Sequence, residues 1–218
     1  MDTVTSKDGI VVAPHQTLLA ARLSFAAGAA SLFCLAILHV LSPEFDTSWR
    51  MVSEYALGNF GWVLSLMFVT QALSCVALFF AIKSQVRTVG GRIGLFFLLA
   101  AGVGMAMASV FDVTHKLHGL SALIGIPGIS IAELILGVSL SRNPAWSSKR
   151  RLLLWTANLP WISLVLMVTM LFIGLSQSGG TFGPGVLIGW PNRLLIVAYC
   201  GWLMSIAWQV NQLHGQKS

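Results

Sequence analysis

Six long apolar runs constrain this chain more than any other feature. They cover residues 18–41, 59–82, 93–111, 119–141, 152–175 and 191–211. Each run has about the 20 residues that a helix needs to cross the hydrocarbon core of a bilayer. Charged residues make up only 9% of the sequence, too few to cover the surface of a water-soluble domain. Because backbone polar groups must pair internally in lipid, we expect an all-α integral membrane bundle of six transmembrane helices.

The polar segments are too short to form a second domain or a linker. We expect a polar cytoplasmic tail at 1–17, a six-helix transmembrane domain at 18–211 and a second cytoplasmic tail at 212–218. The first segment carries Asp2 and Asp8, and no small-residue cleavage site follows the first apolar run. A removable signal peptide is therefore not expected.

The basic residues predict an orientation. A net charge of +6 can indicate a nucleic-acid partner, but here the basic residues concentrate in alternate loops, so none is expected. If both termini share one side with the second and fourth connections, that side collects ten of the thirteen basic residues. The ten are Lys7, Arg22, Lys83, Arg87, Arg92, Arg142, Lys149, Arg150, Arg151 and Lys217. The positive-inside rule then places both termini in the cytoplasm (N-in/C-in) of a multi-pass protein of the cell membrane.

Acidic and imidazole side chains gather at the opposite, extracytoplasmic side. With the exception of Glu133, the acidic residues beyond the N-terminal tail are expected there, together with three of the five histidines. We expect a shallow pocket under the Gly-rich segment that precedes the last helix. Its predicted residues are Ser53, Glu54, Tyr55, Asp112, His115, His118, Asn192 and Arg193. In the simpler alternative, Arg193 pairs with Glu54 or Asp112 and only holds helices together.

Asp112, His115 and His118 are also candidate metal ligands. They are spaced by three, so on a helix neighbouring members could reach one another, and Zn²⁺ accepts both imidazole and carboxylate. His39 or Glu54 could complete such a site. The alternative is that these residues are ordinary occupants of a polar turn, with Asp112 as a helix cap. A haem between His39 and His118 is disfavoured, because no helix carries the second histidine of a two-haem ladder. No cofactor is firmly indicated.

Glu133 lies inside the fourth apolar run, where an ionised carboxylate is costly. Intramembrane acids often mark proton or ion paths, and the expected partners are Asn158, Gln71 or a hydroxyl group. A protonated, purely structural glutamate is the alternative.

Small residues recur in the third run at Ala100, Gly104 and Ala108, on one face of the expected helix. Such spacing lets two helices approach closely. We expect this contact within the bundle, and a homo-oligomer interface is the alternative.

Four segments carry a family resemblance: "SEYALGNFGW", "SVFDVTHKLHGLSALIG", "LPWISLVLM" and "GPGVLIGWPNRLLIVAY". Together they resemble the domain-of-unknown-function family 998, a group of small prokaryotic multipass membrane proteins, over about residues 20 to 210. The resemblance implies a fold and a membrane location, and matches the family's usual Asp and His to Asp112 and His118. A looser likeness is to membrane hydrolases related to alkaline ceramidases, through Ser53, Asp112 and His118. Their paired histidines on the last helix are missing, since His214 is expected beyond it.

Two classes of function follow. In the first, this uncharacterised membrane protein binds a lipid headgroup, a small molecule or a partner subunit in the pocket, with membrane lipids as its general partners. In the alternative, it is a membrane-embedded metal-dependent hydrolase or a proton-coupled transporter.

Overall fold

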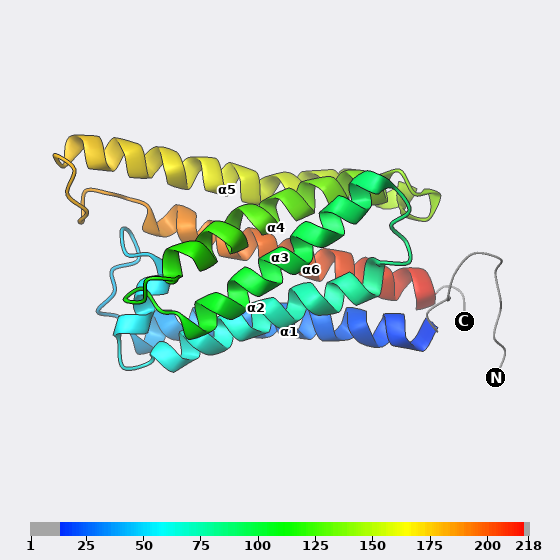
Figure 1. The fold of residues 1–218 in the computed structure, drawn as a ribbon, viewed down its shortest axis with the longest axis horizontal. Coiled ribbons are helices and arrows are strands. Elements are labelled where there is room, and N and C mark those ends of the chain that lie inside the picture. The colour runs from blue at the N-terminus through cyan, green and yellow to red at the C-terminus, as the bar shows by residue number, and fades with distance from the viewer. Residues whose placement is uncertain (1–13, 216–218) are drawn as a thin grey trace.

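The computed structural model describes residues 14–215 and is helical over the expected spans (Figure 1). The six long helices are α1 (Pro14–Leu41), α2 (Gly61–Ile82), α3 (Val89–Val110), α4 (His118–Ser141), α5 (Arg150–Gln177) and α6 (Gly189–Gly215). Within the described residues, six helices are long and apolar enough to cross a membrane. The chain is therefore a multipass membrane protein with the predicted all-α fold.

The first and last helices extend a few residues beyond the expected apolar runs. Residues 14–17 belong to α1 and residues 212–215 to α6, whereas 1–13 and 216–218 lie outside the described residues. The last turn of α6 includes His214, which the sequence analysis placed beyond the helix.

Two short 3-10 helices complete the described structure. The first, η1 (Val52–Leu57), lies between α1 and α2, in the segment that the pocket prediction drew on. The second, η2 (Pro144–Lys149), begins after Asn143, whose side chain accepts a hydrogen bond from the backbone N–H of Ala145. Its Trp146 is buried, and the indole N–H donates to Gln85 Oε1 at 2.8 Å. This contact ties the fourth connection to the second.

The helices form a closed ring in which each packs on the next along the chain and α6 packs on α1. Helix α6 also touches α2, α4 and η1, so it is the element through which most of the bundle is connected. The connections α2–α3 and α4–α5 lie at the end of the bundle where α1 begins and α6 ends (Figure 1). The other three connections gather at the opposite end, which we call the Arg193 end after a residue in the first turn of α6.

Helices α3 and α4 approach each other closely at Gly104, the middle residue of the small-residue stripe. A Cβ atom at this position would lie 2.6 Å from the Cα of Gly125, closer than such atoms can come. The close contact is therefore within the bundle, as preferred from the sequence. It also brings Gly125 and its neighbours on α4 next to α3.

Candidate functional site

Arg193 is the most highly connected polar side chain at its end of the bundle, and it is only 5% exposed. Its Nε donates to His39 Nε2 at 2.8 Å, and its Nη2 donates to the Tyr55 hydroxyl at 3.1 Å. Its Nη1 donates to the carbonyl oxygens of Arg50 at 2.7 Å and Gly189 at 3.0 Å. These acceptors come from α1, the α1–η1 connection, η1 and α6 itself, so one guanidinium group holds three elements together.

The bond to Arg193 defines the tautomer of His39. Its Nδ1 lies 2.6 Å from the carbonyl oxygen of Leu35. A carbonyl oxygen only accepts, so Nδ1 carries the hydrogen and Nε2 offers its lone pair to Arg193. His39 is therefore neutral in this network.

Glu54 is not bonded to Arg193, the partner that the simpler alternative from the sequence gave it. Its Oε1 instead accepts from Arg50 Nη1 at 2.7 Å, and its Oε2 accepts from the backbone N–H of Met51 at 2.7 Å. Arg50 precedes Glu54 by one helical turn, so this local ion pair forms without a long-range contact. Tyr55, by contrast, is fully buried and bonded to Arg193.

The α1–η1 connection is fixed onto the start of α6. The backbone N–H of Gly189 donates to the carbonyl oxygen of Ser48 at 3.0 Å, and a Cβ at Gly189 would lie 2.8 Å from the Ser48 carbonyl carbon. Only glycine allows this approach. The Trp49 ring contacts Phe182 of the α5–α6 connection, with centroids 6.0 Å apart. This end of the bundle is thus closed by contacts between its own loops.

Asp112 and His115 make local contacts in the exposed α3–α4 turn. Asp112 Oδ1 accepts from the backbone N–H of Thr114 at 2.8 Å and from its hydroxyl at 2.6 Å. These bonds stabilise the carboxylate and hold the pKa of Asp112 below its ordinary value. The ring of His115 stacks on Phe111 with centroids 4.5 Å apart, and its Nδ1 accepts from the backbone N–H of Leu117.

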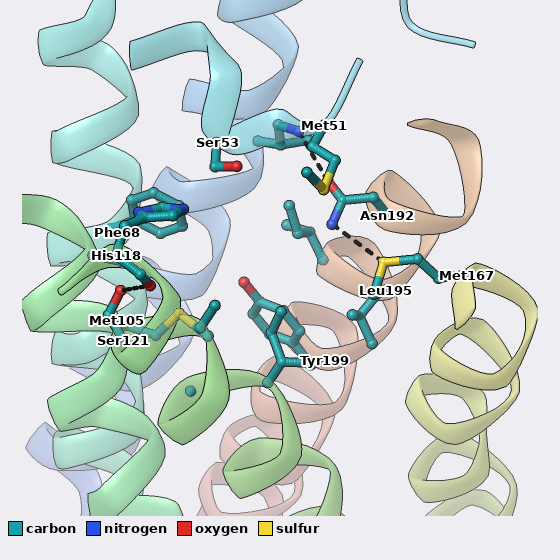
Figure 2. A pocket seen from close by; sticks show the side chains of 16 residues that line it. Met51, Ser53, Phe68, Met105, His118, Ser121, Met167, Asn192, Leu195 and Tyr199 are labelled. Carbon is teal, nitrogen blue, oxygen red and sulfur yellow. Dashed lines mark hydrogen bonds between the residues drawn. The ribbon is translucent and has the colours of Figure 1, made fainter. Parts of the chain in front are cut away.

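A cavity of about 220 Å³ lies beside this network, between η1 and helices α2 to α6 (Figure 2). Three predicted pocket residues, Ser53, His118 and Asn192, line it; Glu54, Tyr55, Asp112, His115 and Arg193 do not. Its wall is mainly apolar, formed by Val52, Phe68, Met105, Ile126, Leu195 and Ile196 among others. The sequence analysis expected a pocket under the Gly-rich segment before the last helix. No residue of 178–188 lines this cavity. We call this space the η1–α4–α6 cavity.

Three polar groups in the cavity wall are available to a ligand, and one of them is the Ser53 hydroxyl, which has no hydrogen-bond partner among the described residues. His118 Nδ1 lies 2.9 Å from the carbonyl oxygen of Phe111 and so carries the hydrogen, which leaves Nε2 as an acceptor. The Tyr199 hydroxyl points into the cavity (Figure 2). Neither His118 Nε2 nor the Tyr199 hydroxyl is hydrogen-bonded to another residue in the described part of the chain. Asn192 is already used, because its Oδ1 accepts from the backbone N–H of Val52 at 2.9 Å.

The candidate metal ligands are dispersed by these contacts. Within residues 14–215, no three His, Cys, Asp or Glu side chains are grouped closely enough to hold a metal ion. Both ring nitrogens of His39 are engaged, with Leu35 and Arg193. Zinc binding by Asp112, His115 and His118 stays a prediction for metal analysis.

Sequence reasoning did not identify Tyr199 or the apolar cavity wall. Tyr199 lies within the last apolar run and is one of only two tyrosines in the chain, so its hydroxyl was an available signal. Phe68, Met105 and Ile126 carried no such signal, because an apolar side chain in a membrane helix has the same sequence pattern whether it faces a cavity, a neighbouring helix or lipid.

Comparison with known proteins identifies the family. A model for proteins of unknown function, DUF998, matches residues 25–209, and the chain belongs to this family. No curated protein and no solved structure matches the chain.

Proposed function

We propose that this member of the DUF998 family is a membrane binding protein whose η1–α4–α6 cavity takes an uncharged amphipathic molecule. The observation that carries the proposal is an apolar cavity with three hydrogen-bonding groups that have no partner among the described residues: His118 Nε2 and the hydroxyls of Tyr199 and Ser53. Ligand sites commonly combine an apolar wall with a few polar groups that orient the ligand.

The size of the cavity limits what it can hold. A cavity of about 150 Å³ with apolar walls can take up benzene. At about 220 Å³, the η1–α4–α6 cavity has room for one ring or a short stretch of a single hydrocarbon chain, but not for a whole two-chain lipid. The ligand is therefore a small amphipathic molecule or one chain of a larger one.

The charges around the cavity favour a neutral ligand. No charged side chain lines it, and Arg193 next to it is committed to four neutral acceptors. An ionised headgroup would lose its hydration in the cavity without gaining an opposite charge. A hydroxyl group, by contrast, can donate to His118 Nε2 and accept from Tyr199.

Photocrosslinking with a monoacylglycerol that carries a diazirine in its chain tests this proposal. The substitution Ala122→Phe fills the cavity from α4, and Leu123→Phe is its matched control, because Leu123 is 68% exposed on the outside of the same helix. Wild type and Leu123→Phe should label on peptides of α4 or α6, and Ala122→Phe about 10-fold less, a loss of about 1.4 kcal/mol of binding free energy. Equal labelling of all three proteins, or labelling confined to the outer surface of α5, would overturn the proposal.

A further inference from the structure

Two buried polar side chains, Glu133 and Gln71, lie deeper in the bundle than the cavity. Glu133 on α4 and Gln71 on α2 are both 0% exposed. None of their four side-chain oxygen and nitrogen atoms has a hydrogen-bond partner among the described residues. Asn158, an expected partner of Glu133, is exposed and donates to the Leu154 carbonyl instead.

Both side chains lie in the interior of the bundle. Cys75 on α2 and Tyr199 and Cys200 on α6 lie near enough to Glu133 for a charge on its carboxyl group to act on them. Gln71 lies one helical turn before Cys75, on the same face of α2. Residues of α2, α4 and α6 therefore converge on one polar region inside the membrane-spanning bundle.

The polar region lies beyond the η1–α4–α6 cavity along α2 and α4 and shares Tyr199 with it on α6. On α2, Gln71 follows the cavity residue Phe68 by three positions, which is less than one turn. On α4, Glu133 follows the cavity residue Ile126 by seven positions, on the same face and about 10 Å farther along. On α6, Tyr199 belongs to both, because it lines the cavity and interacts with Glu133.

Buried polar groups in proteins almost always have a partner, and where protein atoms do not supply one, ordered water commonly does. The nearby hydroxyl of Ser130 is not free, because it donates to the Ile126 carbonyl at 3.1 Å. Four buried and unpartnered atoms on Glu133 and Gln71 thus indicate a hydrated site. Ionisable residues within membrane helices typically serve as proton or ion sites.

We propose that Glu133 and Gln71 enclose water and form an intramembrane proton-binding site that is reached from the η1–α4–α6 cavity past Tyr199. A hydronium ion, or a chain of waters, delivers a proton to a carboxylate oxygen of Glu133, which becomes the neutral acid and leaves water behind. Release is the reverse step. The titratable groups that face Glu133 are Cys75, Tyr199 and Cys200, and no charged side chain of the described residues acts on it.

A proton fits this site better than a metal cation. Glu133 and Gln71 together offer three oxygen atoms, whereas Ca²⁺ takes six or more oxygen ligands and Mg²⁺ requires an octahedral set. The Gln71 amide nitrogen is a donor, which suits the carbonyl oxygen of a protonated carboxyl group or a water molecule. The site does not require that the cavity binds a ligand.

Infrared spectroscopy of the full chain in lipid nanodiscs tests the site. Wild type should show the carbonyl band of a buried carboxylic acid, which shifts in D₂O and is absent from Glu133→Gln. The rate of this deuterium shift should fall at least 10-fold in Tyr199→Phe. The matched control is Tyr55→Phe, because Tyr55 is the other tyrosine of the chain and does not line the cavity. Its rate should equal that of wild type.

Three results would overturn the proposal: a band that persists in Glu133→Gln, equal exchange in wild type and Tyr199→Phe, or a band that Na⁺ removes at constant pH. If Glu133→Gln does not fold, Gln71→Leu gives the answer. It keeps the acid but removes its polar neighbour, so the band must shift in frequency, and an unshifted band counts against the site. The Ala122→Phe experiment decides ligand binding separately.

Discussion

At the residue scale, Arg193 shows how a buried cation is accommodated without an acidic hydrogen-bond partner among the described residues. Burial of a charge is costly unless hydrogen bonds replace its hydration. Here His39, Tyr55 and two backbone carbonyl groups provide acceptors, and the neutral tautomer of His39 is required for one of them. The residue therefore contributes to stability through geometry more than through charge pairing.

Replacement of Arg193 should destabilise the bundle. In Arg193→Met, the ring nitrogen of His39 and the Tyr55 hydroxyl lose their donor, and each buried group left unsatisfied costs about 1–3 kcal/mol. We expect the free energy of unfolding in mixed micelles to fall by about 2–4 kcal/mol. The free energy of unfolding of Arg193→Lys should lie between those of wild type and Arg193→Met. An ammonium group keeps the charge but cannot reproduce the planar fork of hydrogen-bond donors of a guanidinium group.

The control is Arg151→Met, which removes an exposed arginine at the other end of the bundle. It should change the free energy of unfolding by no more than about 0.5 kcal/mol. If the two methionine variants unfold alike, the Arg193 network does not stabilise the protein.

The side-chain partners of Arg193 could be predicted only in part. Its position near the start of the last helix followed from the sequence. The sequence also suggested acidic partners, because opposite charges are the usual solution for a buried cation. Carbonyl oxygens and a neutral imidazole leave no signal in a sequence, so this part of the network required coordinates.

At the element scale, the six long helices were predictable because a run of about 20 apolar residues has few other stable forms. Helix η2 was not predicted, since its polar sequence from Pro144 to Lys149 resembles an ordinary loop. The apolar wall of the cavity was missed for a related reason. It arises where α3 and α4 approach at Gly104 and where η1 meets α6, and neither distance can be read from one segment alone.

The turn between α3 and α4 has a defined pH dependence. Thr114 bonds favour the charged form of Asp112, so its folded pKa lies below the unfolded value of about 3.9. A lowered pKa stabilises the turn above the unfolded pKa, and this contribution is lost as the pH falls through the folded pKa. The contribution of Asp112 to the stability of the turn should thus stay constant between pH 5 and 8. It should be lost only in acid, at about pH 4 and below.

Thr114→Val removes the hydroxyl donor and should raise the pKa of Asp112 toward its ordinary value. A carbon-13 NMR titration of the aspartate carboxyl groups measures this shift, and Thr156→Val, at a hydroxyl that donates to a helix carbonyl on α5, serves as control. An unchanged Asp112 pKa in Thr114→Val would show that the turn does not form as described.

At the scale of the whole molecule, the predicted orientation in the membrane can be tested with cysteine labelling. The three native cysteines are buried, so they give little background. A membrane-impermeant maleimide should label Thr181→Cys in intact cells, and Ser148→Cys only after permeabilisation, because both positions are exposed at opposite ends. Labelling of Ser148→Cys alone in intact cells would reverse the orientation predicted by the positive-inside rule.

The proposed η1–α4–α6 cavity ligand is an uncharged amphipathic molecule. Native mass spectrometry can detect such a molecule bound to the protein. The measurement compares wild type, Ala122→Phe and Leu123→Phe, each released from nanodiscs made with lipids of the expressing cell. Wild type and Leu123→Phe should retain one additional neutral mass that is absent from Ala122→Phe. The same bound mass in all three proteins, or no bound mass in wild type, would show that the η1–α4–α6 cavity does not hold such a molecule.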